Sequence, residues 1–266
     1  MLKFNGENVV KGRFPNNEVD YVNICTSKEE NKERWDVFEL IYESNEDLFN
    51  LLVMKKRWDD AGWNFKKEKC CLKIKYFPYC QMDREMPTHL FSLKYVAQII
   101  NEMKFDNILV CDPHSNVLPA LLNRCEVEYP VNNPIKVDNY DLYFYPDNGA
   151  AKKYSEFLDM PYRFGNKKRN LDTGEIVCYE VIADKADIEG KRILIVDDMV
   201  MGGRTFVEAA KALREMGASQ VDLYVTHLKP ESRKFYNSKG NGLIDNIYTA
   251  DTLEMIQYFN MPEPRP

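Results

Sequence analysis

The stretch KRILIVDDMVMGGRTF, residues 191–206, contains the pattern that decides the fold of this protein. Its apolar run, Ile193–Val196, is typical of a short buried strand and is followed directly by two acids, Asp197 and Asp198. Two carboxylates at the end of a strand can accept hydrogen bonds from neighbouring hydroxyls of a sugar. The same pattern also fits an ordinary surface turn in which an aspartate caps the next helix.

Two glycines, Gly202 and Gly203, come next, and Arg204 and Thr205 lead into a segment with helical spacing of apolar residues. We predict a helix over Thr205–Met216, ended by the glycine that follows. Backbone N–H groups in a glycine turn and in the first turn of a helix can together hold a phosphate. The stretch therefore predicts a strand, a turn and a helix that hold a sugar phosphate, or else a plain strand-to-helix connection.

Short apolar runs alternate with amphipathic segments along the rest of the chain, which is typical of α/β proteins. The predicted strands are Val19–Ile24, Val37–Ile41, Cys71–Tyr76, Ile108–Cys111, Leu142–Tyr145, Ile176–Val181, Ile193–Val196 and Val221–Thr226. The predicted helices are Glu46–Trp58, Leu90–Met103, Ala150–Leu158 and Thr205–Met216. Strands followed by polar residues indicate parallel sheets with ligand groups at their carboxyl ends.

A polar segment divides this pattern into two halves. Residues 129–139, YPVNNPIKVDN, contain two prolines and three asparagines and have the composition of a linker. We therefore expect an α/β fold with two domains, residues 1–131 and 132–266, each built on a mostly parallel sheet flanked by helices.

The composition excludes several classes of protein. The 266 residues carry 36 Lys and Arg against 42 Asp and Glu, a net charge of −6, so nucleic acid is not an expected partner. No apolar stretch is long enough to predict a membrane span. The seven cysteines lack a CxxC spacing, and an odd number without a secretory signal indicates reduced thiols in the cytoplasm.

Three further segments carry groups that could bind metal or phosphate. His114 in VCDPHS is either a metal ligand or part of a satisfied polar pair. Asp147 in YPDNGAAKKY either holds Mg²⁺ through water or caps the next helix. Lys167 and Arg169 lie in RFGNKKRNLDTGE, which is either a solvated polar loop or a mobile loop that closes over a phosphoryl group.

Two segments near the amino terminus have weaker signals when each is taken alone. In YFPYCQMDRE, Arg84 follows a predicted strand and could clamp a polyphosphate. In KGRFPNNEV, Phe14 could stack on a base whose edge Asn16 and Glu18 read, but packing of this ring in the core is the more ordinary expectation.

The order of these motifs resembles that of the ribose-phosphate pyrophosphokinase family. GRFPNNEV, PYCQMDR, CDPHS, YPDNG, NKKR, VDDMVMGGRT and LIDNIYTADTLE occur in the family's order and at roughly its spacings, from about Gly12 to Glu254. Simple phosphoribosyltransferases share the phosphoribosyl-diphosphate loop but have no counterpart of the first three segments. The resemblance implies two similar phosphoribosyltransferase-like domains, with ATP on the amino-terminal side and ribose phosphate on the carboxy-terminal side.

The resemblance also implies a role for each matching residue. The residues implied in ATP binding are Phe14, Asn16 and Glu18, which match the segment that holds adenine from a neighbouring subunit, and Gln81, Asp83 and Arg84 of the ATP loop. The residues implied around the ribose phosphate are Asp197 and Asp198 at the hydroxyls, and Gly202, Gly203, Arg204 and Thr205 at the 5-phosphate. The residues implied in catalysis are Lys167 and Arg169 of the flexible loop, with His114 and Asp147 at Mg²⁺.

The implied reaction moves the β,γ-diphosphate of ATP to the C1 hydroxyl of a 5-phosphorylated ribose and releases AMP. Positioning and electrostatics supply most of the catalysis in such transfers. The implied partners are ATP, Mg²⁺, a 5-phosphoribosyl small molecule and further copies of the chain, in nucleotide or NAD metabolism. Two alternatives stay open: a non-catalytic regulatory relative of these enzymes, and a phosphoribosyltransferase acting on a base.

Three departures from the family pattern matter. Gln81 replaces an arginine of the family's Y-A-R-Q-D-R, and the loop D-T-G-G-T reads MGGRT, with Met201 for an acid and Arg204 for a glycine. The chain also ends soon after TADTLEM, without the family's carboxy-terminal helical segment, which puts the usual assembly in question. A guanidinium can bind phosphate with two hydrogen bonds. Arg204 therefore indicates either an acceptor larger than ribose 5-phosphate, such as ADP-ribose, or a replacement for a cation lost elsewhere.

Overall fold

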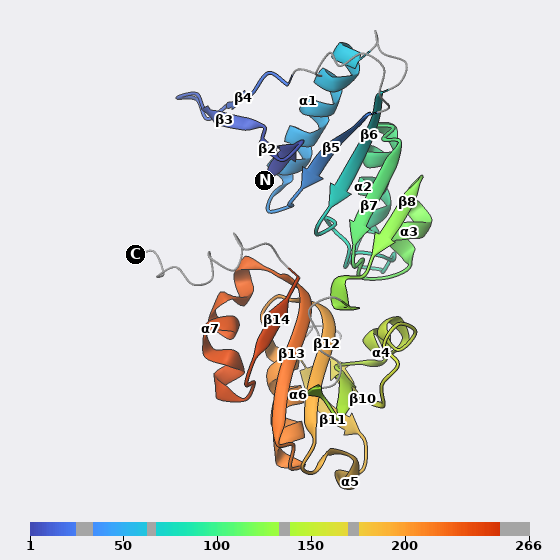
Figure 1. Cartoon of the computed structure of the whole chain (residues 1–266), viewed down its shortest axis with the longest axis vertical. Coiled ribbons are helices and arrows are strands. Elements are labelled where there is room, and N and C mark those ends of the chain that lie inside the picture. The colour runs from blue at the N-terminus through green and yellow to red at the C-terminus, as the bar shows by residue number, and fades with distance from the viewer. Residues whose placement is uncertain (25–33, 63–67, 133–138, 170–175, 251–266) are drawn as a thin grey trace. The chain divides into compact units, whose positions relative to one another are not determined.

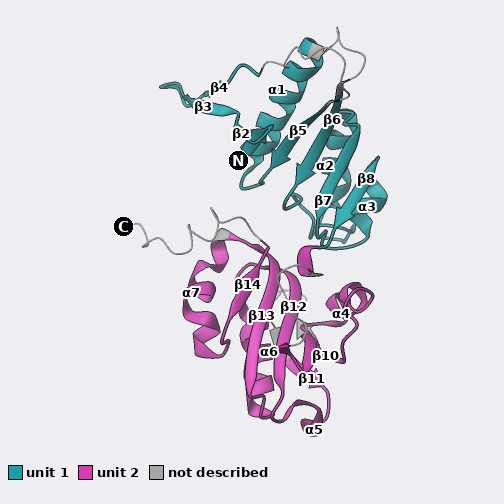
Figure 2. Cartoon of the chain, in the orientation of Figure 1, with its two compact units in different colours: residues 1–129 teal, residues 130–266 magenta. Residues whose placement is uncertain are grey.

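The computed structural model describes residues 1–24, 34–62, 68–132, 139–169 and 176–250 (Figure 1). The chain divides into two compact units, Met1–Tyr129 and Pro130–Pro266 (Figure 2). The expected border after residue 131 lies two residues beyond this division. Of the predicted linker, Pro130–Asn132 forms a 3₁₀ turn, and residues 133–138 lie outside the described residues.

Unit 1 is built on a six-stranded sheet with the order β2-β1-β5-β6-β7-β8. Its strands are β1 (Leu2–Phe4), β2 (Glu7–Asn8), β5 (Arg34–Leu40), β6 (Glu68–Ile74), β7 (Asn107–Cys111) and β8 (Cys125–Glu128). Its helices are α1 (Asn45–Gly62), α2 (Ser92–Glu102) and α3 (Val117–Leu121). Strands β5 to β8 run parallel, because a helix returns the chain between each successive pair.

A separate two-stranded hairpin, β3 (Val10–Arg13) and β4 (Val19–Tyr21), extends from unit 1 away from its sheet (Figure 1). The hairpin is tied to α1 at two points: at its base the Tyr21 hydroxyl donates to Asn50 Oδ1 at 2.7 Å, and next to its turn the Arg13 side chain forms an ion pair with Glu46. The strand predicted over Val19–Ile24 thus ends three residues earlier than expected.

Unit 2 is built on a second six-stranded sheet, with the order β11-β10-β9-β12-β13-β14. Its strands are β9 (Leu142–Tyr145), β10 (Tyr162–Arg169), β11 (Ile176–Ile182), β12 (Arg192–Val200), β13 (Gln220–Leu228) and β14 (Ile247–Thr249). Its helices are α4 (Asn148–Tyr154), α5 (Lys185–Ile188), α6 (Arg204–Glu215) and α7 (Arg233–Gly242). All strands are parallel except β11, which pairs antiparallel with β10.

Different helices cover the two faces of the central strands of unit 2. Phe144 of β9 and Ile195 of β12 share one face and belong to the core formed with Phe206 of α6. On the other face, the ring of Tyr145 stacks on Tyr154 of α4, with ring centroids 6.3 Å apart. The connections leave β9 and β12 over opposite faces, so their carboxyl ends form a topological switch point, where open α/β sheets bind ligands.

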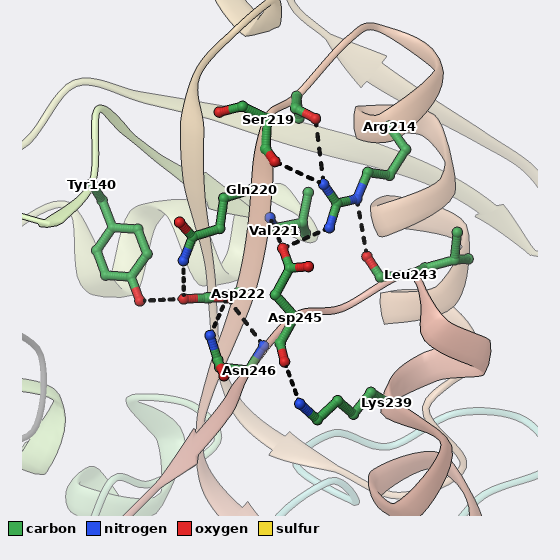
Figure 3. A network of polar contacts seen from close by, with 11 residues as sticks. Tyr140, Arg214, Ser219, Gln220, Val221, Asp222, Lys239, Leu243, Asp245 and Asn246 are labelled. Carbon is green, nitrogen blue, oxygen red and sulfur yellow. Dashed lines mark hydrogen bonds and ion pairs between the residues drawn. The ribbon is translucent and has the colours of Figure 1, made fainter.

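A polar network lies near the other end of the same sheet, around Asp222 of β13 (Figure 3). The Asp222 side chain is fully buried. Its Oδ2 accepts hydrogen bonds from the Tyr140 hydroxyl at 2.7 Å and Gln220 Nε2 at 2.8 Å. Its Oδ1 accepts from the backbone N and the Nδ2 of Asn246 at 3.1 and 3.2 Å. This carboxylate thus joins the start of β13 to the segments that lead into β9 and β14.

The predicted fold class is confirmed, and the predicted strand Leu142–Tyr145 has the observed bounds of β9. The predicted helix over Ala150–Leu158 is shorter, since α4 ends at Tyr154. The prediction of a loop over the first part of RFGNKKRNLDTGE is wrong, because these residues form β10. No helix in the described ranges is both long and apolar enough to cross a membrane. The five cysteines whose side chains are described are free thiols, and four of them are buried.

Candidate functional site

The two acids of the opening stretch lie inside β12 rather than after it. The pairing of β12 with β9 stops at Ile195, but the pairing with β13 continues to Val200, opposite Leu228. Strand β12 therefore extends four residues beyond the predicted end, and Asp197 and Asp198 are part of it. Because β9 has already ended there, Asp197 and Asp198 lie at the switch point, where β12 no longer pairs with β9.

Asp197 lies in surroundings that disfavour its ionised form. Asp198 is buried, and its backbone N donates to Asp197 Oδ1 at 2.9 Å. Burial raises the pKa of Asp197 well above its ordinary value, and the nearby carboxylates of Asp198 and Asp147 raise it further. A ligand that brings hydroxyl donors or a cation to this point relieves the repulsion between the carboxylates.

Asp147 comes directly after β9 and begins α4. Its Oδ1 accepts from the backbone N of Ala150 at 3.0 Å, so it caps the helix. Its Oδ2 forms an ion pair with Lys167. Burial alone would raise the pKa of Asp147, but Lys167 and the backbone N–H groups of the helix outweigh it, so the pKa lies below its ordinary value. The capping alternative for Asp147 is therefore confirmed, and the same carboxylate also holds the cation of β10.

Lys167 lies on a β-hairpin and not on an irregular loop. Strands β10 and β11 pair antiparallel, with Lys167 opposite Tyr179. The parallel pairing of β10 with β9 ends at Phe164–Tyr145, so Lys167 lies beyond the end of β9 and reaches back to Asp147. The backbone of Arg169 ends β10, while its side chain and residues 170–175 lie outside the described part of the chain.

The turn from β12 to α6 depends on one of its two glycines. Gly203 has φ +77°, and a Cβ placed on it would lie 2.2 Å from ring atoms of Phe235, which comes from α7. Gly202 has neither constraint, since a Cβ there would meet nothing within 4 Å. Arg204 is exposed and Thr205 is half-buried, and together they form the first turn of α6. The loop thus presents backbone N–H groups and a guanidinium at a helix amino terminus, an arrangement suited to phosphate.

We predict that Gly203→Ala lowers the free energy of unfolding by about 2 kcal/mol or more, because it combines left-handed strain with overpacking against Phe235. Gly202→Ala is the matched control, and we expect a change within about 0.5 kcal/mol. Urea unfolding of both variants, followed by far-UV circular dichroism, measures the difference. Equal stability of the two variants would contradict this account of the loop.

Unit 1 brings together another part of the predicted site at the ends of β6 and β7. Asp83 is buried, and Arg84 Nε donates to its Oδ1 at 3.1 Å. Burial would raise the pKa of Asp83, but hydrogen bonds from Ser115 and Arg84 outweigh it and the pKa lies below its ordinary value, with a further contribution from His114. The loops that contain PYCQMDR and CDPHS therefore meet around the carboxylate of Asp83. The Arg84 side chain remains largely exposed.

The tip of the β3–β4 hairpin holds the residues predicted to bind adenine. Phe14 is 53% exposed, so the expectation that it packs in the core is wrong. Its backbone N donates to Glu18 O at 2.9 Å, and Asn16 Oδ1 accepts from the backbone N of Glu18 at 3.2 Å. Both of these hydrogen bonds stay within the hairpin. The structure thus presents an exposed aromatic ring on a projecting turn, separate from the Asp83 cluster.

Two aromatic residues near the site were not among the predicted residues. Tyr179 lies opposite Lys167, and Phe235 packs on Gly203. Both positions follow from contacts between segments that are distant in sequence, so no local motif signals them. For Tyr179 the only available signal is alternation within Ile176–Val181, which predicts the strand but not its partner.

The predicted metal-binding residues do not form a metal cage of their own. Within the described ranges, no three His, Cys, Asp or Glu side chains are grouped closely enough to hold a metal ion. Both oxygens of Asp147 already have partners in unit 2, and His114 is exposed in unit 1. A divalent cation at Asp147 would therefore need oxygen ligands from a bound phosphate and from water, which is the usual coordination of Mg²⁺.

Comparisons with known proteins agree with this architecture. A model of the phosphoribosyl transferase domain matches residues 149–251. Ribose-phosphate pyrophosphokinase of Marinomonas sp. is 28% identical over an alignment of 278 residues, covering 97% of this chain and 82% of that protein. The protein of the same name from Shewanella oneidensis is 28% identical, with coverages of 92% and 78%. Phosphoribosylpyrophosphate synthetase from Mycobacterium smegmatis has a similar fold, with a TM-score of 0.65, 19% identity and coverages of 86% and 78%.

Proposed function

We propose that this chain, which is similar to ribose-phosphate pyrophosphokinases, transfers the β,γ-diphosphate of ATP to the C1 hydroxyl of a 5-phosphorylated ribose. One observation carries the proposal. The ion pair between Lys167 and Asp147 stands beside Asp197 at the switch point of unit 2. A cation, two acids and a glycine turn that leads into a helix therefore lie around one end of one sheet, which supports the proposal.

Each group has a defined task in the proposed reaction. Asp197 and Asp198 accept hydrogen bonds from the ribose hydroxyls, and the turn before α6 binds the 5-phosphate. The C1 hydroxyl oxygen then attacks the β-phosphorus of ATP, its proton passes to solvent, and AMP leaves with the electrons of the broken P–O bond. Lys167 stabilises negative charge on the transferring group, and we assign the same task to Arg169.

ATP would bind through unit 1, where Asp83 orients Arg84 and the neighbouring loop carries His114. We propose that Gln81 belongs to this ATP loop and that Phe14, Asn16 and Glu18 hold adenine in a neighbouring subunit of a homo-oligomer. The exposure of Phe14 on a projecting hairpin supports the latter assignment.

Mg²⁺ fits the charge pattern of unit 2. The raised pKa of Asp197 reports a concentration of carboxylates that a divalent cation would relieve. Asp147 would hold the ion, directly or through water, together with phosphate oxygens of the nucleotide, while the metal-binding role of His114 in unit 1 stays a prediction. When bound, Mg²⁺ neutralises charge on the polyphosphate.

Substitution of Arg204, which is exposed in the first turn of α6, tests the identity of the acceptor. We propose an acceptor with a diphosphate at its 5-position, such as ADP-ribose, because a guanidinium adds two directed hydrogen bonds to those of the backbone. We expect Arg204→Ala to raise the KM for ADP-ribose by roughly tenfold or more. The KM for ribose 5-phosphate should change by less than about threefold, because the backbone of the loop is kept.

The measurement is AMP release from ATP and Mg²⁺ with each acceptor. Lys211→Ala is the matched control, because Lys211 lies on the same helix and forms an i,i+4 ion pair with Glu215, away from the turn that leads into the helix. Equal effects of Arg204→Ala on both acceptors would refute the preference for a diphosphate. No AMP with either acceptor would refute the transfer reaction and favour a non-catalytic regulatory protein.

A further inference from the structure

Tyr179 connects the hairpin that carries Lys167 to the end of β9. It lies on β11 opposite Lys167, and its hydroxyl donates to the carbonyl oxygen of Pro146 at 3.2 Å. Pro146 directly precedes Asp147, the partner of Lys167. The Tyr179 side chain therefore links β11, the strand that pairs with the Lys167 segment, to the residue that directly precedes Asp147.

The ring of Tyr179 reaches Pro146 only because position 165 has no side chain. A Cβ at Gly165 would lie 2.1 Å from the Tyr179 hydroxyl oxygen, 2.5 Å from its Cζ and 2.9 Å from the carbonyl oxygen of Pro146. Gly165 is not in a left-handed conformation, so its small size rather than its backbone freedom is what the packing uses. Gly165, Tyr179 and Pro146 form a contact that we call the hairpin clasp.

The hydroxyl in this clasp remains a donor under ordinary conditions. Burial raises the pKa of Tyr179, and the nearby carboxylates of Asp147 and Asp197 raise it further. The protonated hydroxyl can bond to the Pro146 carbonyl without adding negative charge next to the acids. The clasp thus lies within electrostatic reach of both carboxylates without competing with Lys167 for them.

We propose that Tyr179 is a positioning residue that holds the β10–β11 hairpin against the end of β9 and thereby fixes the Lys167–Asp147 pair. The inference rests on the proposed function, because it assigns Lys167 a catalytic task. The backbone pairing of β10 with β9 ends at Phe164, three residues before Lys167. The clasp provides a further contact between the hairpin and the end of β9, closer to Lys167. A displacement of a catalytic cation by about 1 Å is enough to slow a reaction strongly.

Tyr179→Phe tests the proposal, since it removes the hydroxyl and keeps the ring over Gly165. We expect kcat to fall by roughly fivefold to tenfold, as for loss of one neutral hydrogen bond, with the KM for both substrates within about twofold. Gly165→Ala keeps the hydroxyl but displaces the ring, and we expect a fall of at least the same size. Tyr162→Phe is the control at the other end of β10, where turnover should be unchanged.

A double variant separates positioning from a general loss of structure. If Tyr179 acts through Lys167, then Tyr179→Phe should cause no further loss of turnover in a Lys167→Ala background. A loss that multiplies in the double variant, or wild-type turnover in Tyr179→Phe alone, would overturn the proposal.

Hydrogen exchange of the described β10 and β11 amides tests the clasp independently of turnover. We expect exchange in Tyr179→Phe to be about fivefold faster than in wild type near residues 164–167 and unchanged in β13. Unchanged exchange near residues 164–167 would overturn the clasp. If wild-type protein released no AMP, the proposed function would fail, and faster exchange would still support the contact itself.

Discussion

Lys167→Ala should lower kcat for AMP release by roughly 10²-fold to 10³-fold, which is the usual cost of removing one preorganised charge from a transition state. The side chain is held at the switch point by Asp147 and lies next to the half-buried Asp197. Alanine removes the cation that pairs with Asp147, and no backbone group replaces its charge. Steady-state kinetics with saturating ATP and acceptor measure the effect.

The fold should survive this substitution. Lys167 and Asp147 are each more than a fifth exposed, so their ion pair contributes at most about 1 kcal/mol to the free energy of unfolding. Lys152→Ala on α4 provides the matched control, since this exposed lysine is close in sequence to Asp147 but is not assigned to the reaction. Near-normal turnover of folded Lys167→Ala would remove Lys167 from the mechanism.

Asp222→Ala should produce the largest loss of stability, about 3–5 kcal/mol. The carboxylate is fully buried and accepts hydrogen bonds from Tyr140, Gln220 and Asn246. Removing it leaves these donors without their acceptor and opens a space at the start of β13. The free energy of unfolding of unit 2 falls because unpaired donors are costly inside a protein.

Asp245→Ala is the control within the same network (Figure 3). Its carboxylate is 44% exposed and accepts from Arg214 Nη2 at 2.6 Å and the backbone N of Val221 at 2.9 Å. Water can replace it, so we expect a loss of only about 1 kcal/mol. Equal losses in the two variants would contradict the assignment of Asp222 as the centre of the network.

The probe for this comparison must report on unit 2. All three tryptophans lie in unit 1, so their fluorescence follows the wrong unit. Hydrogen exchange of the β13 amides reports on the affected sheet. Asp222 lies near the start of β13 and the site lies beyond the end of β9, so turnover per folded molecule should be unchanged.

Local patterns in the sequence were enough to predict the parts of the fold that depend on near neighbours. The apolar run Leu142–Tyr145 has the bounds of β9, because a buried central strand needs apolar residues throughout. The helix after Gly203 begins and ends within one residue of its prediction, because its apolar spacing, its glycine turn and its terminating glycine are all local signals. The order of the motifs then indicated the family.

Only the tertiary structure decided how the predicted residues meet. Strand β12 continues through Asp197 and Asp198 because β13 supplies backbone partners, and ladder hydrogen bonds do not depend on side-chain polarity. For the same reason the cationic segment around Lys167 forms a strand against β11.

The ion pair of Lys167 with Asp147 and the clasp of Tyr179 on Gly165 both join residues more than ten positions apart. Periodicity reports on residues within a turn or a strand, whereas these contacts are set by which strands lie side by side. The sequence by itself therefore determined the α/β pattern and the inventory of charged groups. Strand order and register in unit 2 decided which of those groups share one site.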